Sequence, residues 1–154
     1  MRIALSVEYN GANYFGWQKQ KIHKEKTIQY HIDLAISKIA DEQISTICAG
    51  RTDTGVHAFS QIIHFDTTKR RLDYKWINGI NSNLPSDVIV KKIYHVDEDF
   101  HARYSAQSRT YRYIILNQKY PSTFLSSNVL HFSDTINISK IKSAFKYLKG
   151  EKDF

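Results

Sequence analysis

The residue of the sequence most suited to covalent chemistry is Asp53, in the run Arg51-Thr52-Asp53-Thr54-Gly55. A carboxylate two residues after an arginine can stay ionised through charge pairing. On a turn that leaves an apolar strand, its oxygen can point into a cleft, so the pattern indicates a nucleophile held in place. The alternative is a turn-forming aspartate that accepts hydrogen bonds from its own backbone.

The triplet Asp53-Thr54-Gly55 also occurs in aspartic proteases, in which two such aspartates share a proton. Here polar residues, Arg51 and Thr52, precede the triplet, and the sequence holds no second copy. The sequence therefore disfavours an aspartic protease.

Charge points to a polyanionic partner. The 154-residue chain has a formal net charge of +7, and basic side chains that neutralise phosphates release counterions and steer association. Solubility alone is an alternative reason for a basic surface. The lysine-rich residues 19–26 leave a similar choice between a solvated loop and a phosphate contact.

Cysteine and histidine usage argues against metal chemistry. Cys48 is the only cysteine, and the seven histidines show no metal-ligand spacing. We therefore expect no disulfide and no metal site. Without a signal-peptide core or an apolar run long enough to cross a bilayer, we expect a cytoplasmic protein with no membrane partner.

The elements that must position Asp53 follow from periodicity. Residues 3–9 alternate as a half-buried strand does, and apolar residues after Thr27, the expected cap, repeat as on a helix. The predicted order β-α-β-β-α-β is typical of a ferredoxin-like antiparallel sheet with helices on one face, an α+β fold. The elements are strand 3–9, a helix after Thr27, strands 44–49 and 61–65, a helix over 72–80 and a strand over 88–96.

We expect residues 1–100 to form this domain and residues 101–154 to begin a second one. Residues 110–116 and 129–132 predict two more strands, and Ser139 is expected to cap a last helix that ends by Gly150. Because no linker composition separates the two parts, the boundary near residue 100 is soft.

The run around Asp53 resembles the tRNA pseudouridine synthase A (TruA) family, and further motifs of the chain resemble that family in the same order. The resemblance implies half of a pseudouridine synthase catalytic core, with residues 101–154 starting the other half. Family chains continue further, so we expect this one to be truncated. The motifs are residues 7–11 (VEYNG) with 14–18 (YFGWQ), 81–85 (NSNLP), 99–106 (DFHARYSA) and 109–113 (RTYRY).

By resemblance, the protein is an isomerase that converts uridine to pseudouridine in the anticodon stem-loop of tRNA, without cofactor and as a homodimer. Asp53 is then the nucleophile, and the sequence leaves open whether it attacks ribose C1′ or adds to uracil C6. Arg51 is its electrostatic partner, or fills the space of the displaced base.

The resemblance also assigns substrate contacts. Tyr111 is expected to pack against the target uracil, with Arg109 on the same strand face and Tyr113 serving the core. Without the family, a tyrosine on a strand is more often a core residue. His101 and Arg103 are expected to contact the RNA backbone, with ordinary surface pairing as the alternative.

Two other classes of function stay open at this point. One is an RNA-binding ferredoxin-like fragment without catalytic activity, and the other is a nonfunctional remnant. Asp53, Arg51 and Tyr111 favour the synthase, because a binding module needs no nucleophile in a preorganised turn. The expected loss of the second half favours the alternatives.

Overall fold

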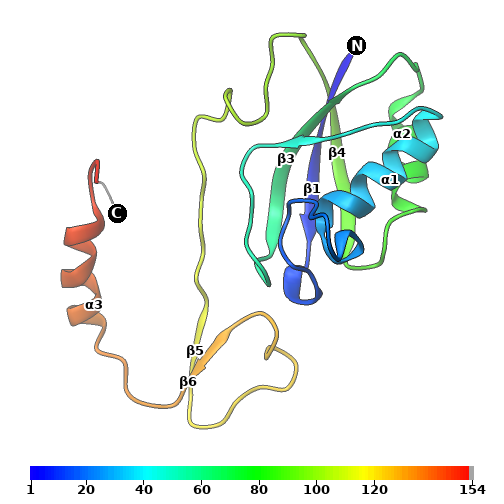
Figure 1. Ribbon diagram of the computed structural model, residues 1–154. Coiled ribbons are helices and arrows are strands. Elements are labelled where there is room, and N and C mark those ends of the chain that lie inside the picture. The colour runs from blue at the N-terminus through cyan, green and yellow to red at the C-terminus, as the bar shows by residue number, and fades with distance from the viewer. Residues whose placement is uncertain (153–154) are drawn as a thin grey trace. The chain divides into compact units, whose positions relative to one another are not determined.

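Strand β1 (Arg2–Tyr9) lies in the middle of a four-stranded sheet. In the computed structural model, which describes residues 1–152, β1 pairs antiparallel with β3 (Ala58–Asp66) and β4 (Val88–Val96). The short strand β2 (Ile47–Cys48) pairs antiparallel with β3. The strand order is therefore β2-β3-β1-β4 (Figure 1).

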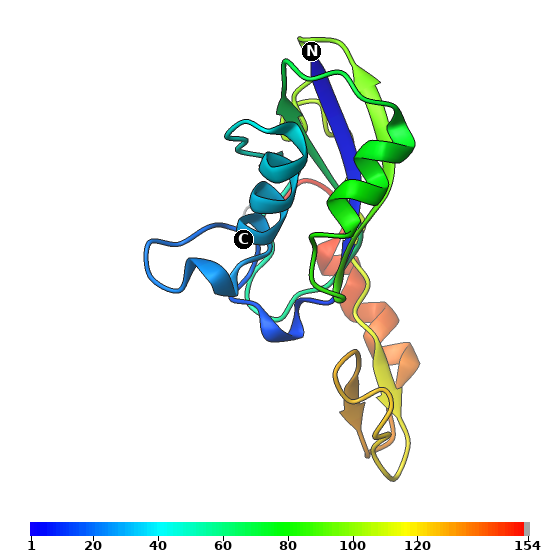
Figure 2. The ribbon, with the colours of Figure 1, turned by 90° about the vertical axis from the view of Figure 1, so that its right-hand side faces the viewer.

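Two helices, α1 (Ile28–Ala40) and α2 (Asp73–Asn81), cover one face of this sheet (Figures 1 and 2). Alternate residues of β1 point toward them and join one hydrophobic core. The predicted β-α-β-β-α-β order, the antiparallel sheet and the α+β class are confirmed. Fully buried core residues include Ile3, Leu5, Val7, Ile32, Ile36, Trp76 and Ile80.

The prediction of a side-chain cap at Thr27 is wrong in detail. Thr27 occupies the N-cap position of α1, but its hydroxyl donates to the carbonyl oxygen of Lys24 (2.6 Å). The short 3-10 helix Lys24–Lys26 precedes it and offers this nearer acceptor. Thr27 therefore closes the preceding turn instead of binding the first amides of the helix.

The chain divides into two compact units, Met1–Arg109 and a second that begins at Thr110. In the second, β5 (Ile115–Asn117) pairs parallel with β6 (Leu130–Phe132), and α3 (Ile138–Phe145) continues into the 3-10 helix Lys146–Leu148. None of its described residues is buried. The boundary that we expect near residue 100, between the ferredoxin-like domain and the start of a second domain, stays a prediction.

Two predictions for the second unit are wrong in detail. The strand expected over residues 110–116 is limited to β5, because the backbone before Ile115 has no strand partner within the described residues. Asn137, not Ser139, caps α3: its side chain accepts a hydrogen bond from the Lys140 amide (2.9 Å). Asparagine two positions earlier is an equally good cap, and sequence did not separate the two.

No helix within residues 1–152 is long and apolar enough to span a bilayer.

Candidate active site

Asp53 lies on the turn between β2 and β3, and its side chain is exposed. The residue before it is held from two sides. The Trp17 amide donates to the Thr52 carbonyl oxygen (2.9 Å), and the hydroxyls of Tyr9 and Thr52 share a hydrogen bond of 2.8 Å. Burial raises the pKa of the Tyr9 hydroxyl, so this group stays protonated. The backbone that presents Asp53 is therefore anchored to the core.

Two glycines of the first loop allow close contact with this turn. Gly16 has a φ of +88°, and a Cβ added there would lie 2.5 Å from the Thr52 carbonyl oxygen. A Cβ added at Gly11 would lie 2.0 Å from the carbonyl oxygen of Val56. A side chain at either position would push the backbone of the aspartate turn outward. The backbone of residues 10–17 therefore packs closely against the aspartate turn and fixes its position. We call these residues the template loop.

The same template is joined to the start of α1. The amides of Ile28 and Gln29 donate to the carbonyl oxygens of Gly16 (3.2 Å) and Trp17 (3.0 Å). These amides belong to the first turn of the helix, which has no partners of its own for them. The aspartate turn, the template loop and α1 thus form one hydrogen-bonded unit.

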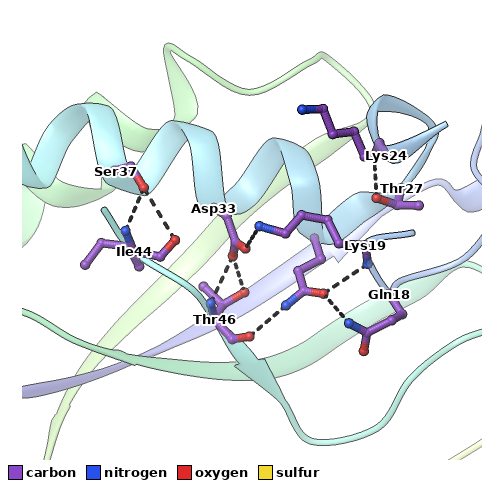
Figure 3. Close-up of polar contacts among 9 residues, drawn as sticks. Gln18, Lys19, Lys24, Thr27, Asp33, Ser37, Ile44 and Thr46 are labelled. Atoms are coloured by element: carbon purple, nitrogen blue, oxygen red, sulfur yellow. Dashed lines mark hydrogen bonds and ion pairs between the residues drawn. The ribbon is translucent and has the colours of Figure 1, made fainter. Parts of the chain in front are cut away.

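A buried polar network fixes the segment that enters β2 (Figure 3). Asp33 of α1, almost fully buried, accepts hydrogen bonds from the amide (3.0 Å) and hydroxyl (2.7 Å) of Thr46. Lys19 lies 2.8 Å from the other carboxylate oxygen of Asp33, and the Gln29 side chain donates to the Thr46 carbonyl oxygen. Since β2 leads directly to Arg51, this network sets where the aspartate turn begins. Lys19 therefore has a structural partner, although it belongs to the lysine-rich segment.

Three arginines meet at a pocket of about 580 Å³ beside β2. They are Arg51, Arg103 and Arg109, and within residues 1–152 no carboxylate lines the pocket with them. Arg109 is positioned by its contacts with the carbonyl oxygens of Ala49 (2.6 Å) and Arg103 (3.4 Å). None of the ion pairs within residues 1–152 involves these guanidinium groups, so their charge faces the pocket and solvent.

Arg51 and Asp53 do not form a direct ion pair in the described structure. Arg51 lines the pocket, whereas Asp53 is not among its lining residues. The electrostatic pairing of the two residues stays a prediction.

His101 and Arg103 lie on a folded segment against the sheet face opposite the helices. His64 of β3 is buried there, and its Nδ1 accepts a hydrogen bond from the Ala102 amide (3.1 Å). Burial lowers the pKa of His64, because the imidazolium form would lose hydration. Arg2 donates to the carbonyl oxygen of Phe100 (2.7 Å). These contacts bring Arg103 to the pocket that Arg51 lines.

Tyr111 belongs to the second unit, outside any strand, and its side chain is 81% exposed. Its role at the uracil stays a prediction. Tyr113 was expected in the core, and that expectation is wrong: its side chain is 78% exposed. The alternation of polar and aromatic residues suggested a strand, but the described structure has no buried surface at this position to receive one face of it.

The remaining histidine and cysteine near the turn have structural surroundings. His57 Nδ1 accepts a hydrogen bond from the Gly11 amide (3.3 Å). Cys48 is buried in β2, and this burial raises the pKa of its thiol. Within residues 1–152, no cluster of three or more histidine, cysteine, aspartate or glutamate residues suits a metal ion.

Sequence reasoning missed the roles of Tyr9, Gly11 and Gly16 around the turn. The available signal was the spacing of two glycines among aromatic residues in the first loop, because glycine there permits close backbone approach.

Comparison with known proteins places these features in a family context. Residues 5–105 match the family described as tRNA pseudouridine synthase. The chain is 49% identical to tRNA pseudouridine synthase A of Colwellia psychrerythraea, 48% to that of Aeromonas hydrophila and 46% to that of Vibrio cholerae, each over all 154 residues. The aligned regions cover 59%, 56% and 58% of these relatives, so the chain spans somewhat over half their length.

Proposed function

The chain belongs to the tRNA pseudouridine synthase family, and from this premise we propose that Met1–Arg109 carries the nucleophile and part of the RNA-binding surface of a tRNA-modifying isomerase. The observation that carries the proposal is the anchored turn of Asp53. An exposed carboxylate on an anchored backbone, two residues after an arginine that lines a basic pocket, suits covalent attack on a nucleotide.

The reaction breaks the bond between uracil N1 and ribose C1′ and forms a bond from C5 to C1′. In one route, a carboxylate oxygen of Asp53 bonds to C1′ as N1 leaves with the electron pair. In the other, the oxygen adds to C6 while the electron pair of the C5–C6 double bond moves onto the C4 carbonyl as an enolate, and the N1–C1′ bond breaks in a later step. After the base turns and C5 bonds to C1′, the C5 hydrogen leaves as a proton, N1 gains a proton, and Asp53 is released. The isomerisation is redox-neutral, so it requires no electron carrier or other cofactor.

The arginines have a separate task in this proposal. Uracil must leave the base stack before a nucleophile can reach it, and the RNA backbone must be held meanwhile. Arg51, Arg103 and Arg109 bind phosphates at the basic pocket, with His101 supporting the segment that carries Arg103. Arg51 is near enough in sequence to Asp53 to enter the space of the displaced base. Tyr111 stacks on the target uracil.

Finer features also belong to the proposal. The sheet order and the β-α-β-β-α-β succession suit a ferredoxin-like half of the catalytic core. We assign uridines of the anticodon stem-loop as substrates, a homodimer as the active form and the cytoplasm as the location.

Tritium release from tRNA labelled at uracil C5 tests this function, because rejoining through C5 must expel that hydrogen. We expect release by the chain, loss of release in Asp53→Asn, and full release in the control Asp41→Asn, whose carboxylate is 89% exposed. Affinity for tRNA should change little in Asp53→Asn. Release that persists in Asp53→Asn removes this residue from its role.

A second candidate function is an RNA-binding module without turnover. The basic pocket favours it, because phosphate binding there needs no contribution from Asp53. A folded chain that binds tRNA in a salt-dependent manner, yet releases no tritium, supports this candidate over the synthase.

A further inference from the structure

Tyr104 stands out as a large aromatic side chain that is both exposed and supported. It is 77% exposed, yet one face of its ring stacks on His101, with centroids 4.3 Å apart and planes at 27°. An exposed ring with a fixed backing offers a flat surface to a second aromatic group.

The segment that carries this ring, residues 100–105, folds back on itself; we term it the aromatic hook. The Ser105 amide donates to the His101 carbonyl oxygen (2.7 Å), and the His101 amide donates to the Ser105 hydroxyl (3.0 Å). The Tyr104 amide lies 3.3 Å from Nδ1 of His101. The hook therefore has its own hydrogen bonds, and Tyr104 is held at its tip.

The hook is also fixed to the sheet. Ala102 is buried and its amide donates to buried His64, whose ring lies 4.9 Å from the ring of His101. A column of three rings thus runs from the sheet to the surface, through His64, His101 and Tyr104. Such support lowers the entropy that Tyr104 would lose on binding a partner.

A cationic group lies beside the column. The guanidinium carbon of Arg103 lies over the Tyr104 ring, 5.8 Å from its centroid, and Arg103 also lines the basic pocket with Arg51 and Arg109. Aromatic rings next to phosphate-binding arginines are the arrangement by which proteins hold unpaired nucleotides, because every base presents a face for stacking.

We propose that Tyr104 is a stacking platform for an unpaired RNA base, while Arg103 binds an adjacent phosphate. The choice of RNA rests on the proposed function. The platform itself is an additional binding residue, separate from the nucleophile Asp53 and from Tyr111.

The test compares binding of two RNA probes by the full chain: a hairpin with 2-aminopurine in its loop and a blunt duplex without unpaired bases. We expect Tyr104→Ala to weaken hairpin binding roughly tenfold and to remove the quenching of 2-aminopurine. Tyr104→Phe keeps both, since stacking needs no hydroxyl. Affinity for the duplex changes in neither variant. The matched control is Tyr74→Ala, which removes another exposed tyrosine, from α2.

Circular dichroism establishes that each variant is folded. Equal losses for hairpin and duplex, or unchanged hairpin binding in Tyr104→Ala, overturn the platform. A wild-type chain without preference for the hairpin overturns it too, whatever its turnover. Because this assay needs no catalysis, hairpin binding that depends on Tyr104 in a chain without tritium release supports the platform and contradicts only the proposed synthase activity.

Discussion

The two units of the chain contain similar elements but differ in what supports them. In Met1–Arg109, two helices and four strands share a core with fully buried tryptophan, isoleucine and valine side chains. In the unit that begins at Thr110, a helix and a pair of strands are formed, yet none of the described residues is buried. Secondary structure alone therefore does not fix a side chain in space, whereas a shared core does.

This difference determines which of the proposed site residues have positions that packing and hydrogen bonds fix. Asp53 and the three pocket arginines belong to the first unit, where anchored loops set their positions. Tyr111 belongs to the second, where its ring is exposed. Both tryptophans, Trp17 and Trp76, are in the first unit, so tryptophan fluorescence follows the unfolding of that unit alone.

The largest expected effect comes from the core of the first unit. Trp76 is fully buried and packs edge-on against Phe65. Trp76→Ala should cost about 3–5 kcal/mol of unfolding free energy in urea titrations, measured by circular dichroism because the variant loses a fluorophore. Phe145→Ala, in the second unit, removes a ring that is 54% exposed and should cost less than about 0.5 kcal/mol. Similar losses in the two variants would contradict the contrast between the units.

Gly16→Ala should have the next largest effect. The new Cβ would meet the Thr52 carbonyl oxygen at a backbone φ that alanine rarely adopts, so we expect a loss of about 1–3 kcal/mol and a fall in tritium release. The control is Gly150→Ala, which has a similar φ of +91° but no atom of the described residues within 4 Å of the added carbon. It should leave the fluorescence-detected transition unchanged. A wild-type transition in Gly16→Ala would show that the template loop does not press against the turn.

Tyr9→Phe should have a smaller effect, about 1 kcal/mol, because it removes one hydrogen bond to Thr52 and keeps the packing of the ring. Thr52→Val should cost a similar amount, and the double variant should cost less than the sum of the two. Additive losses in this double-mutant cycle would mean that the two hydroxyls are not coupled. Tyr113→Phe, in the exposed second unit, should change nothing measurable.

The smallest expected effect is a pH dependence that arises at His64. Its pKa in the folded state is below the ordinary value of 6.5, so the unfolded chain binds the proton more readily. The contribution of neutral His64 is therefore complete above pH 6.5 and is lost as the pH falls toward the folded-state pKa. Between about pH 8 and about pH 5, His64→Gln should therefore lose less stability than wild type. A fall in His64→Gln as large as in wild type, or larger, would contradict this assignment.

Much of the first unit could be predicted because its patterns are periodic. The strand Val88–Val96 was predicted to the residue, since it is rich in β-branched residues, and α1 followed from its apolar face. The position of Asp53 between two strands was also predicted correctly. Caps were harder to predict: several polar residues competed near the starts of α1 and α3, and small differences in local geometry decided between them.

The supports of the site could not be predicted from periodicity. The hydrogen bond from Tyr9 to Thr52 joins residues 43 positions apart, and Arg109 reaches the carbonyl oxygen of Ala49 across 60 positions. These contacts depend on how loops meet after the sheet has formed. Tyr113 was instead predicted to be buried and is exposed. An alternating pattern predicts a buried face only where another element covers that face.

Amide hydrogen exchange over the whole chain tests the central claim most directly, namely that the turn of Asp53 is built in advance by the first unit. We predict slow exchange at Trp17 and Gly55, whose amides bind the Thr52 and Tyr14 carbonyl oxygens, and much faster exchange at the amides of residues 118–129 in the second unit. Exchange at Trp17 and Gly55 as fast as in residues 118–129 would contradict the account, because the nucleophile would then lie on a turn that forms only when RNA binds.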